Sequence, residues 1–102
     1  TGIVSSNGQT ASDVRTVSGT VTVRPIDRVL KADASGGAVT VNLPSAAPNL
    51  VTYSVIKSDA TGNTVTVDPA GAETINGAAT RVLSAQWETV TIKSDGTNWI
   101  AV

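Results

Sequence analysis

The stretch Val39-Thr40-Val41-Asn42-Leu43 alternates apolar and polar residues, and Val65-Thr66-Val67-Asp68 does the same. A period of two is typical of a β-strand whose aliphatic side chains face a core and whose polar side chains face solvent. Val21-Thr22-Val23 and Val90-Thr91-Ile92-Lys93 repeat the pattern. Because no stretch shows a competing helical period, we predict an all-β fold.

The composition also favours a sheet protein. Val and Thr together make 30 of the 102 residues, and side chains branched at Cβ suit a pleated sheet better than a helix. The length allows one domain. Only two Trp and one Tyr are available as aromatic core residues, so we expect self-association to add burial to a thin core.

Turn signals rich in Gly, Asn and Asp separate the alternating runs. They predict strands near residues 14–24, 28–33, 38–44, 51–58, 63–68, 80–85, 87–94 and 97–102. The pattern indicates an antiparallel β-sandwich-like domain over residues 14–102, assembled as a homotrimer. Residues 1–13 read as a polar N-terminal arm or linker.

Two segments of the chain resemble each other, residues 53–63 and residues 89–98, and each contains Ile-Lys-Ser-Asp followed by turn residues. This pattern predicts a strand, a tight turn and a returning strand, and Asp95-Gly96 suits the positive φ of such a turn. Because a third copy at a fixed period is missing, we interpret the likeness as two hairpins rather than as a solenoid.

The net charge and the absence of Cys and His argue against several classes of function. Seven basic and eight acidic residues give a net charge of −1, which provides no electrostatic footprint for a nucleic acid. The absence of Cys and His removes disulfides, thiolate chemistry and the commonest zinc ligand and general base. The uncharged stretch 34–56 contains Pro44 and Pro48, so we expect no membrane insertion. We also expect no cofactor.

One turn has the spacing of a cation site. Asp59-Ala60-Thr61-Gly62-Asn63 places oxygen-bearing side chains at alternate positions, as a calcium loop does. It lacks the further carboxylates and the closing Glu of such a loop, so a hairpin turn capped by the Asp side chain is the favoured reading. Lys31, Lys57 and Lys93 lie near strand ends and are expected to be exposed.

Catalytic pairs are hard to build from this chain. Glu73 and Glu88 are its only glutamates, and nothing in the sequence places them together as a glycosidase would require. Serine hydrolysis would need a base, and there is no His. We therefore expect a protein that is not an enzyme.

The aromatic residues are the best candidates for a binding surface. An exposed indole offers an apolar face and an N–H donor to a sugar, so Trp87, Trp99, Tyr53 and Asn98 are candidate glycan or interface contacts. We expect Trp99 to be a core or interface anchor. Trp87 interrupts the local alternation, which indicates a bulge or an edge position.

From about Arg15 to Val102 the chain resembles the small β-rich domains of tailed-bacteriophage virion proteins. The resemblance rests on an ordered set of short pieces, residues 15–23, 27–33, 39–44, 53–57, 63–71, 73–77 and 90–99. It implies a non-enzymatic structural module, usually a homotrimer, on the particle surface of a tail fibre or related appendage and involved in host adhesion. The partners implied are other virion proteins and a host cell-surface glycan.

Two further readings fit the same residues. A capsid decoration protein would use residues 1–13 as an arm that reaches neighbouring subunits. A monomeric carbohydrate-binding module would present Trp87 or Trp99 to solvent and change its fluorescence with sugar.

Overall fold

The computed structural model describes residues 14–24, 27–46 and 51–102, and the predicted arm at residues 1–13 lies outside this part. Within the described residues the chain forms strands and no helix, so the all-β prediction is confirmed. The strands are β2 (Val14–Val17), β3 (Thr20–Thr22), β4 (Val29–Ala32), β5 (Val39–Asn42), β6 (Thr52–Lys57), β7 (Val65–Asp68), β8 (Arg81–Leu83), β9 (Thr89–Ser94) and β10 (Trp99–Ala101).

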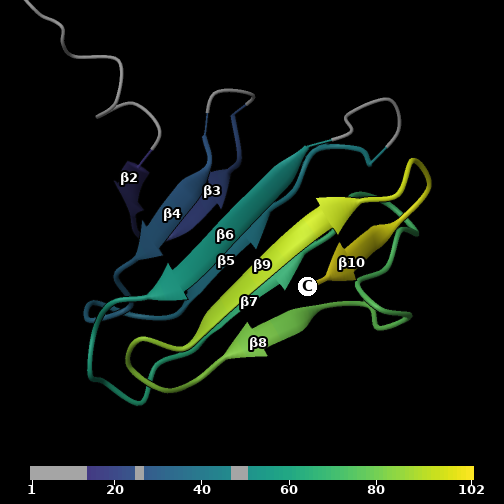
Figure 1. Ribbon diagram of the computed structural model, residues 1–102. Helices are drawn as coiled ribbons and strands as arrows, with labels where there is room; N and C mark the ends of the chain where they lie inside the picture. Colours follow the sequence, from purple (N-terminus) through teal and green to yellow (C-terminus); the bar gives the residue numbers. More distant parts are fainter. Residues whose placement is uncertain (1–13, 25–26, 47–50) are drawn as a thin grey trace, which may run out of the picture.

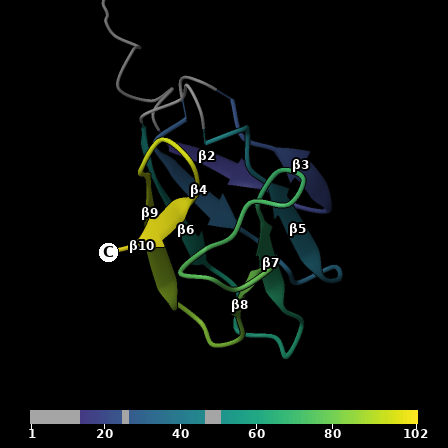
Figure 2. The same ribbon diagram turned by 90° about the vertical axis from the view of Figure 1, so that its right-hand side faces the viewer.

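The strands form two layers (Figures 1 and 2). One sheet has the order β10-β9-β6-β4-β2 and the other has the order β3-β5-β7-β8. From β2 to β7 successive strands alternate between the two sheets, so two consecutive strands make one coil of the chain. Three coils, β2–β3, β4–β5 and β6–β7, stack on one another. The segment from β8 to β10 then closes the last coil.

The coils make much of each sheet parallel. β2, β4 and β6 pair in parallel, and so do β3, β5 and β7. The remaining pairs, β7–β8, β6–β9 and β9–β10, are antiparallel. The prediction of an antiparallel sandwich is therefore wrong for the parallel strands. A chain that crosses to the other sheet after each strand returns in the same direction, whereas a hairpin reverses it.

One of the two predicted hairpins is present. β9 and β10 pair around Asp95-Gly96, where Gly96 has a φ of +95°. The other is wrong, because β6 is followed by a crossing to β7 in the second sheet.

The preference for hairpins over a solenoid is also corrected by the structure. Thr20-Val21-Thr22 stacks in register on Thr40-Val41-Asn42, which stacks on Thr66-Val67-Asp68. The sequence shows no fixed period because the spacing between coils is not constant. The equivalent residues Val14 and Val29 are 15 residues apart, and Val29 and Ser54 are 25 residues apart.

A glycine starts the first crossing. The predicted strand 14–24 divides into β2 and β3 at Ser18-Gly19, where Gly19 has a φ of +67°. Glycine adopts this left-handed conformation without the steric cost of a Cβ atom. The chain therefore leaves one sheet and enters the other within two residues.

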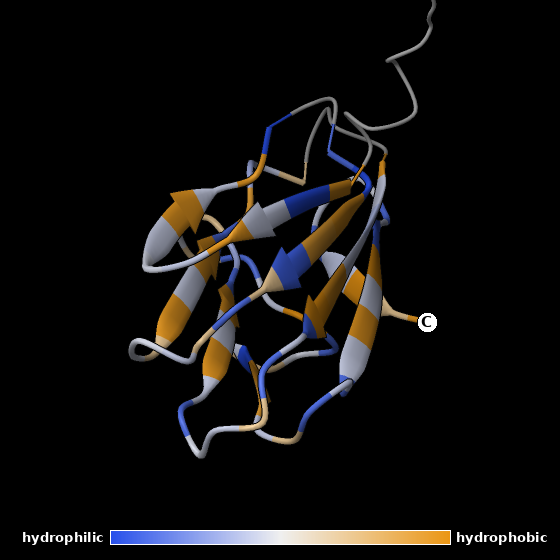
Figure 3. Ribbon diagram, turned by 90° about the vertical axis from the view of Figure 1, so that its left-hand side faces the viewer, coloured by the Kyte–Doolittle hydropathy of each residue, from blue (hydrophilic) through white to orange (hydrophobic). Residues whose placement is uncertain are grey.

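The core lies between the inner faces of the two sheets, where alternate residues along each strand are hydrophobic (Figure 3). Leu30 and Val55 of the first sheet and Val41 and Val67 of the second are fully buried. Burial of a Val or Leu side chain contributes about 1.5–3 kcal/mol. The period-two pattern thus predicts most of the core correctly.

Candidate functional site

The loop of residues 84–88, here called the Trp87 loop, connects β8 to β9 and carries an exposed aromatic ring. Trp87 is 58% exposed. Its φ of +69° lies in the left-handed region, which is a genuine outlier for a bulky residue. Such a conformation costs on the order of 1–3 kcal/mol and persists only where the surroundings enforce it.

Hydrogen bonds on both sides of Trp87 enforce this conformation. The Trp87 N–H donates to the Lys57 carbonyl at 2.7 Å, and the Lys57 N–H donates to the Glu88 carbonyl at 3.0 Å. The Glu88 carboxylate accepts the N–H groups of Ser84 and Ala85 at 2.8 and 3.1 Å. These backbone bonds lower the pKa of Glu88 below its ordinary value. The loop is therefore held by the β6 backbone and by its own acidic cap.

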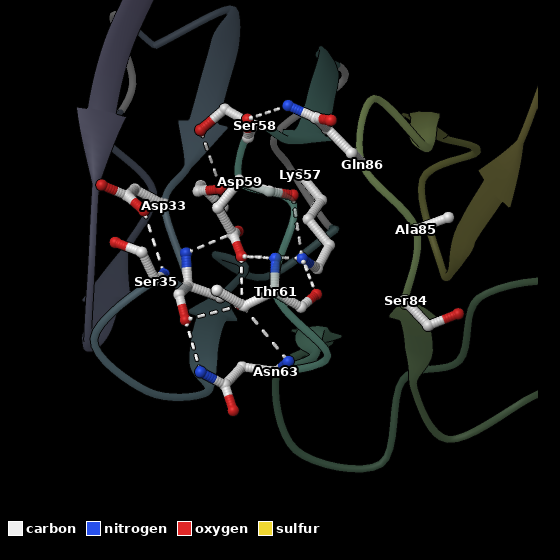
Figure 4. Close-up of polar contacts among 12 residues, drawn as sticks. Asp33, Ser35, Lys57, Ser58, Asp59, Thr61, Asn63, Ser84, Ala85 and Gln86 are labelled. Atoms are coloured by element: carbon white, nitrogen blue, oxygen red, sulfur yellow. Dashed lines mark hydrogen bonds and ion pairs between the residues drawn. The ribbon is translucent and has the colours of Figure 1, made fainter.

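The side chain of Lys57 is fully buried at the end of β6, so the expectation that it is exposed is wrong. Its Nζ donates to the Asp59 carboxylate at 2.8 Å, the Asp59 carbonyl at 3.1 Å and the Thr61 carbonyl at 2.9 Å (Figure 4). An ammonium group has three donors, and all three are used. Lys31 and Lys93 are exposed as predicted.

The Asp59 carboxylate joins two turns. It accepts the N–H of Ala34 at 2.8 Å and the N–H of Thr61 at 3.0 Å, and it also accepts the Thr61 hydroxyl. Asn63 donates its side-chain amide to the Ala34 carbonyl at 2.8 Å. The hydrogen bond from Lys57, followed by that from Thr61, holds the pKa of Asp59 well below its usual range. This Lys57–Asp59 cluster fastens the turn after β4 to the turn after β6.

The Lys57–Asp59 cluster includes the turn at residues 59–63, for which the sequence predicts a cap and a hairpin. The cap is present, because the Asp59 carboxylate accepts the Thr61 N–H, but the turn is a crossing between sheets and not a hairpin. Of the side chains with the spacing of a cation site, only the Asp59 carboxylate bonds to the ammonium group of Lys57, whose other two acceptors are the backbone carbonyls of Asp59 and Thr61. No three acidic side chains within residues 14–24, 27–46 and 51–102 are placed to hold a metal ion.

Gln86 connects the Trp87 loop to this cluster. Its side-chain amide donates to the Ser58 carbonyl at 3.3 Å (Figure 4). Ser58 is itself anchored, because its N–H donates to the Ala32 carbonyl of β4 at 2.9 Å. The loop that carries the exposed ring therefore bonds to Lys57 at the end of β6 and to Ser58, which in turn bonds to β4.

The other candidate residues lie elsewhere. Trp99 and Tyr53 are fully buried, with ring centroids 5.8 Å apart, so Trp99 is a core residue and neither ring offers a face to solvent. Asn98 lies in the β9–β10 turn, where its side-chain oxygen accepts the Thr74 N–H at 3.0 Å, and it lines a shallow hollow. Of the three aromatic residues, Trp87 is the exposed one.

The two glutamates stabilise different connections. Glu73 accepts the Ala46 N–H at 3.0 Å and the Ser45 hydroxyl at 3.1 Å. Glu88 caps its own turn, as described above. Each glutamate thus caps a different connection of the chain.

Lys57, Asp59 and Gln86 are parts of this site that the sequence did not predict. Val29-Leu30-Lys31-Ala32-Asp33 resembles Val55-Ile56-Lys57-Ser58-Asp59, but this likeness is no signal for the first two, because it is one residue out of the register in which Leu30 pairs with Val55 and Lys31 pairs with Ile56. The likeness marks two consecutive coil strands, β4 and β6. No local signal identifies Gln86, whose partner is 28 positions earlier in the chain.

Comparison with protein-family models gives no match, and comparison with curated proteins gives none either. Across the described ranges no helix is long and apolar enough to span a membrane. The function is therefore inferred from the geometry of the Trp87 loop.

Proposed function

We propose that the chain is a non-enzymatic surface module of a tailed-bacteriophage particle, a homotrimer that adheres to the host cell surface through the Trp87 loop. The two-layer all-β architecture and the polar ladder Thr20, Thr40 and Thr66 on the outer face of the second sheet suit a protein that faces solvent on a particle. The coils provide a stable support for a single exposed ring.

The observation that carries this proposal is the backbone of Trp87. A bulky residue occupies a left-handed position that a glycine would occupy without strain, yet the ring is not packed in the core. Packing of the ring in the core therefore does not offset the strain of the Trp87 backbone. An exposed and preorganised indole is a suitable platform for the apolar face of a pyranose ring.

The trimer is supported by strand edges. β2, β3 and β8 end the sheets, and within the described residues no strand pairs with their outer edges, whereas the outer edge of β10 bonds to residues 74–76. Unpaired edges favour association with other chains, and a closed trimer would cover part of them.

Two substitutions at one position test the adhesive role. Trp87→Gly should remove the ring and also relieve the strain, so the free energy of unfolding should stay equal or rise by about 1 kcal/mol. Trp87→Ala should remove the ring and keep the strain. Both variants should lose binding to a printed array of bacterial surface polysaccharides, and denaturant unfolding should rank the glycine variant as the more stable.

The unmodified chain provides the direct readout. Because Trp99 is buried, a ligand-induced change in fluorescence reports on Trp87. Wild-type binding by Trp87→Gly would contradict the adhesive role, and a large loss of stability in that variant would show that the ring is a packing residue.

The oligomeric state is tested separately by light scattering after size exclusion. A homotrimer has three times the 10.3 kDa mass of one chain. A mass of one chain over a wide range of concentration would contradict the trimer while leaving the Trp87 test intact.

A further inference from the structure

A shallow hollow lies beside the β9–β10 turn. Its lining comes from three connections: Ser45 follows β5, residues 70–73 follow β7, and Thr97 and Asn98 follow β9. The hollow, here called the Asn98 hollow, has a volume of about 480 Å³, which is within the range of sites for small organic ligands. Three of the lining residues are glycine or alanine, so a ligand can approach the backbone there.

The side-chain amide of Asn98 is fixed and still has donors to offer. Its Oδ1 accepts the Thr74 N–H at 3.0 Å, and the Asn98 backbone N–H donates to the Asp95 carboxylate at 2.7 Å. Within the described residues its Nδ2 group donates to no acceptor, and the Thr97 hydroxyl has no partner either. The oriented amide and this hydroxyl can therefore donate to a ligand in the hollow.

The carboxylate of Glu73 supplies the acceptor. Its two oxygens accept the Ala46 N–H at 3.0 and 3.1 Å, and one of them accepts the Ser45 hydroxyl at 3.1 Å. An ionised carboxylate has about four acceptor sites, so Glu73 can accept a further hydrogen bond. The turn that carries it is closed by a hydrogen bond from the Glu73 N–H to the Ala70 carbonyl at 3.0 Å. The carboxylate is thus also in place before a ligand arrives.

These groups match the hydroxyls of an uncharged sugar. A hydroxyl both donates and accepts, so two neighbouring hydroxyls of a sugar can donate to Glu73 and accept from Asn98. A second anion beside the Glu73 carboxylate would be repelled, and none of the described residues that line the hollow is basic. A sugar that carries a carboxylate or a phosphate would therefore find no cation here.

We propose that the Asn98 hollow binds an uncharged hexose unit of the cell-surface polysaccharide, at a second contact point of the adhesive module. This inference rests on the adhesive function proposed above and names the class of sugar. The Trp87 loop precedes β9 and the hollow follows it, so the six residues of this strand, about 20 Å in length, separate the two sites (Figure 1). A polysaccharide can contact both sites, whereas one sugar unit contacts one.

The test measures binding of the full chain to mannan, galactan and dextran, three uncharged hexose polymers, by calorimetry. The wild type should bind at least one of them. Asn98→Asp keeps the oxygen that accepts the Thr74 N–H and removes the amide donors. It should weaken binding about tenfold, which corresponds to about 1.4 kcal/mol.

The matched control is Asn76→Asp. The Asn76 side chain also accepts a backbone N–H, that of Ala101 at 3.0 Å, but Asn76 lies outside the lining of the hollow. The same chemical change at this exposed residue should alter binding less than about twofold. Equal effects of the two substitutions would overturn the proposal, and so would a wild type that binds none of the three polymers.

The choice of an uncharged sugar is tested with polygalacturonate, an anionic polymer. The wild type should bind it at least about tenfold more weakly than the uncharged polymer. Glu73→Gln keeps an oxygen for the Ala46 N–H and removes the charge, so it should narrow this difference. Equally tight binding of polygalacturonate by the wild type would contradict the sugar class.

Thermal unfolding of each variant shows whether the fold is intact. If Asn98→Asp lowers stability, Thr97→Val gives an independent measurement, because it removes a hydroxyl at an exposed position. It should weaken binding about threefold, and unchanged binding would count against the hollow.

A failure of the Asn98 hollow and a failure of the Trp87 loop give different results. Loss of binding in Trp87→Gly together with wild-type binding in Asn98→Asp would support the adhesive function and overturn the hollow. The reverse pattern would support the hollow and contradict the role of Trp87.

Discussion

The tetrapeptide Ile-Lys-Ser-Asp occurs twice, and its two copies have opposite environments. In residues 56–59, at the end of β6, Lys57 is fully buried and Ile56 is turned outward and only half-buried. In residues 92–95, at the end of β9, Ile92 is fully buried and Lys93 is exposed. Identical local sequence therefore does not determine which face of a sheet a side chain occupies.

The difference comes from the residues that precede each copy. In β9 the alternation Val90-Thr91-Ile92 directs both aliphatic side chains inward. In β6 the residues Tyr53 and Val55 face inward, which places the next residue on the outer face. A shift of one residue exchanges the two faces of a strand, so Lys57 enters the interior.

The turns after the two copies also differ. Gly96 follows the second copy and adopts a φ of +95°, which allows a tight hairpin back to β10. Ala60 occupies the equivalent place after the first copy, and a Cβ atom disfavours that conformation. The chain after Asp59 crosses to the other sheet instead, and the Lys57–Asp59 cluster holds the crossing.

The strongest test of the difference between the two Ile-Lys-Ser-Asp copies is to make the same substitution in both. Lys57→Met should destabilise the fold by about 3 kcal/mol or more, because it leaves the oxygens around the ammonium group without their cation. Lys93→Met should change stability by less than about 0.5 kcal/mol, since the side chain is exposed. Urea unfolding measures both, and equal effects would show that the two environments are not distinct.

A smaller effect on folding stability is expected when the pH is lowered. The pKa of Asp59 is lowered chiefly by the hydrogen bond from Lys57, and the pKa of Asp95 is lowered chiefly by the backbone N–H of Asn98. A lowered folded-state pKa contributes stability above the unfolded value of about 4 and loses it as the pH falls through the folded value.

Asp59→Asn should therefore flatten the dependence of stability on pH below about 4 more than Asp95→Asn does. Urea unfolding at a series of pH values measures the two slopes. If Asp95→Asn flattens the curve equally, the buried lysine does not distinguish the first copy.

The smallest expected effect on stability tests which face of its strand each isoleucine occupies. Ile92→Val should cost about 1 kcal/mol, because it removes a methyl group from the core. Ile56→Val should destabilise the fold by only about a few tenths of a kcal/mol, because Ile56 faces outward. A greater loss at Ile56 than at Ile92, measured by thermal unfolding, would mean that the phase of β6 is assigned wrongly.

Local signals predict much of this molecule. Alternation identifies Val41, Val67 and Ile92 as core residues, and Asp95-Gly96 identifies a hairpin. Trp87 is predicted as a bulge or an edge position because it interrupts a strand pattern, but it lies in the loop before β9. Gln86 and Ala34 carry no such signal, because their roles arise from partners on other coils.

Local sequence was sufficient to predict the fold class, the positions of β4 to β10 and the hairpin at Gly96, because these depend on period-two alternation and on local turn geometry, but it did not predict the division of residues 14–24 into β2 and β3. Tertiary structure alone decided that consecutive strands alternate between sheets, that Lys57 is buried and Lys93 is not, and that Arg15 of β2 bonds to the buried Asp27. Strand direction and register depend on pairing between coils 15 to 26 residues apart. Val55 and Ile56 are both apolar, so the alternation of β6 has two possible phases, and only packing against β4 and β9 selects one.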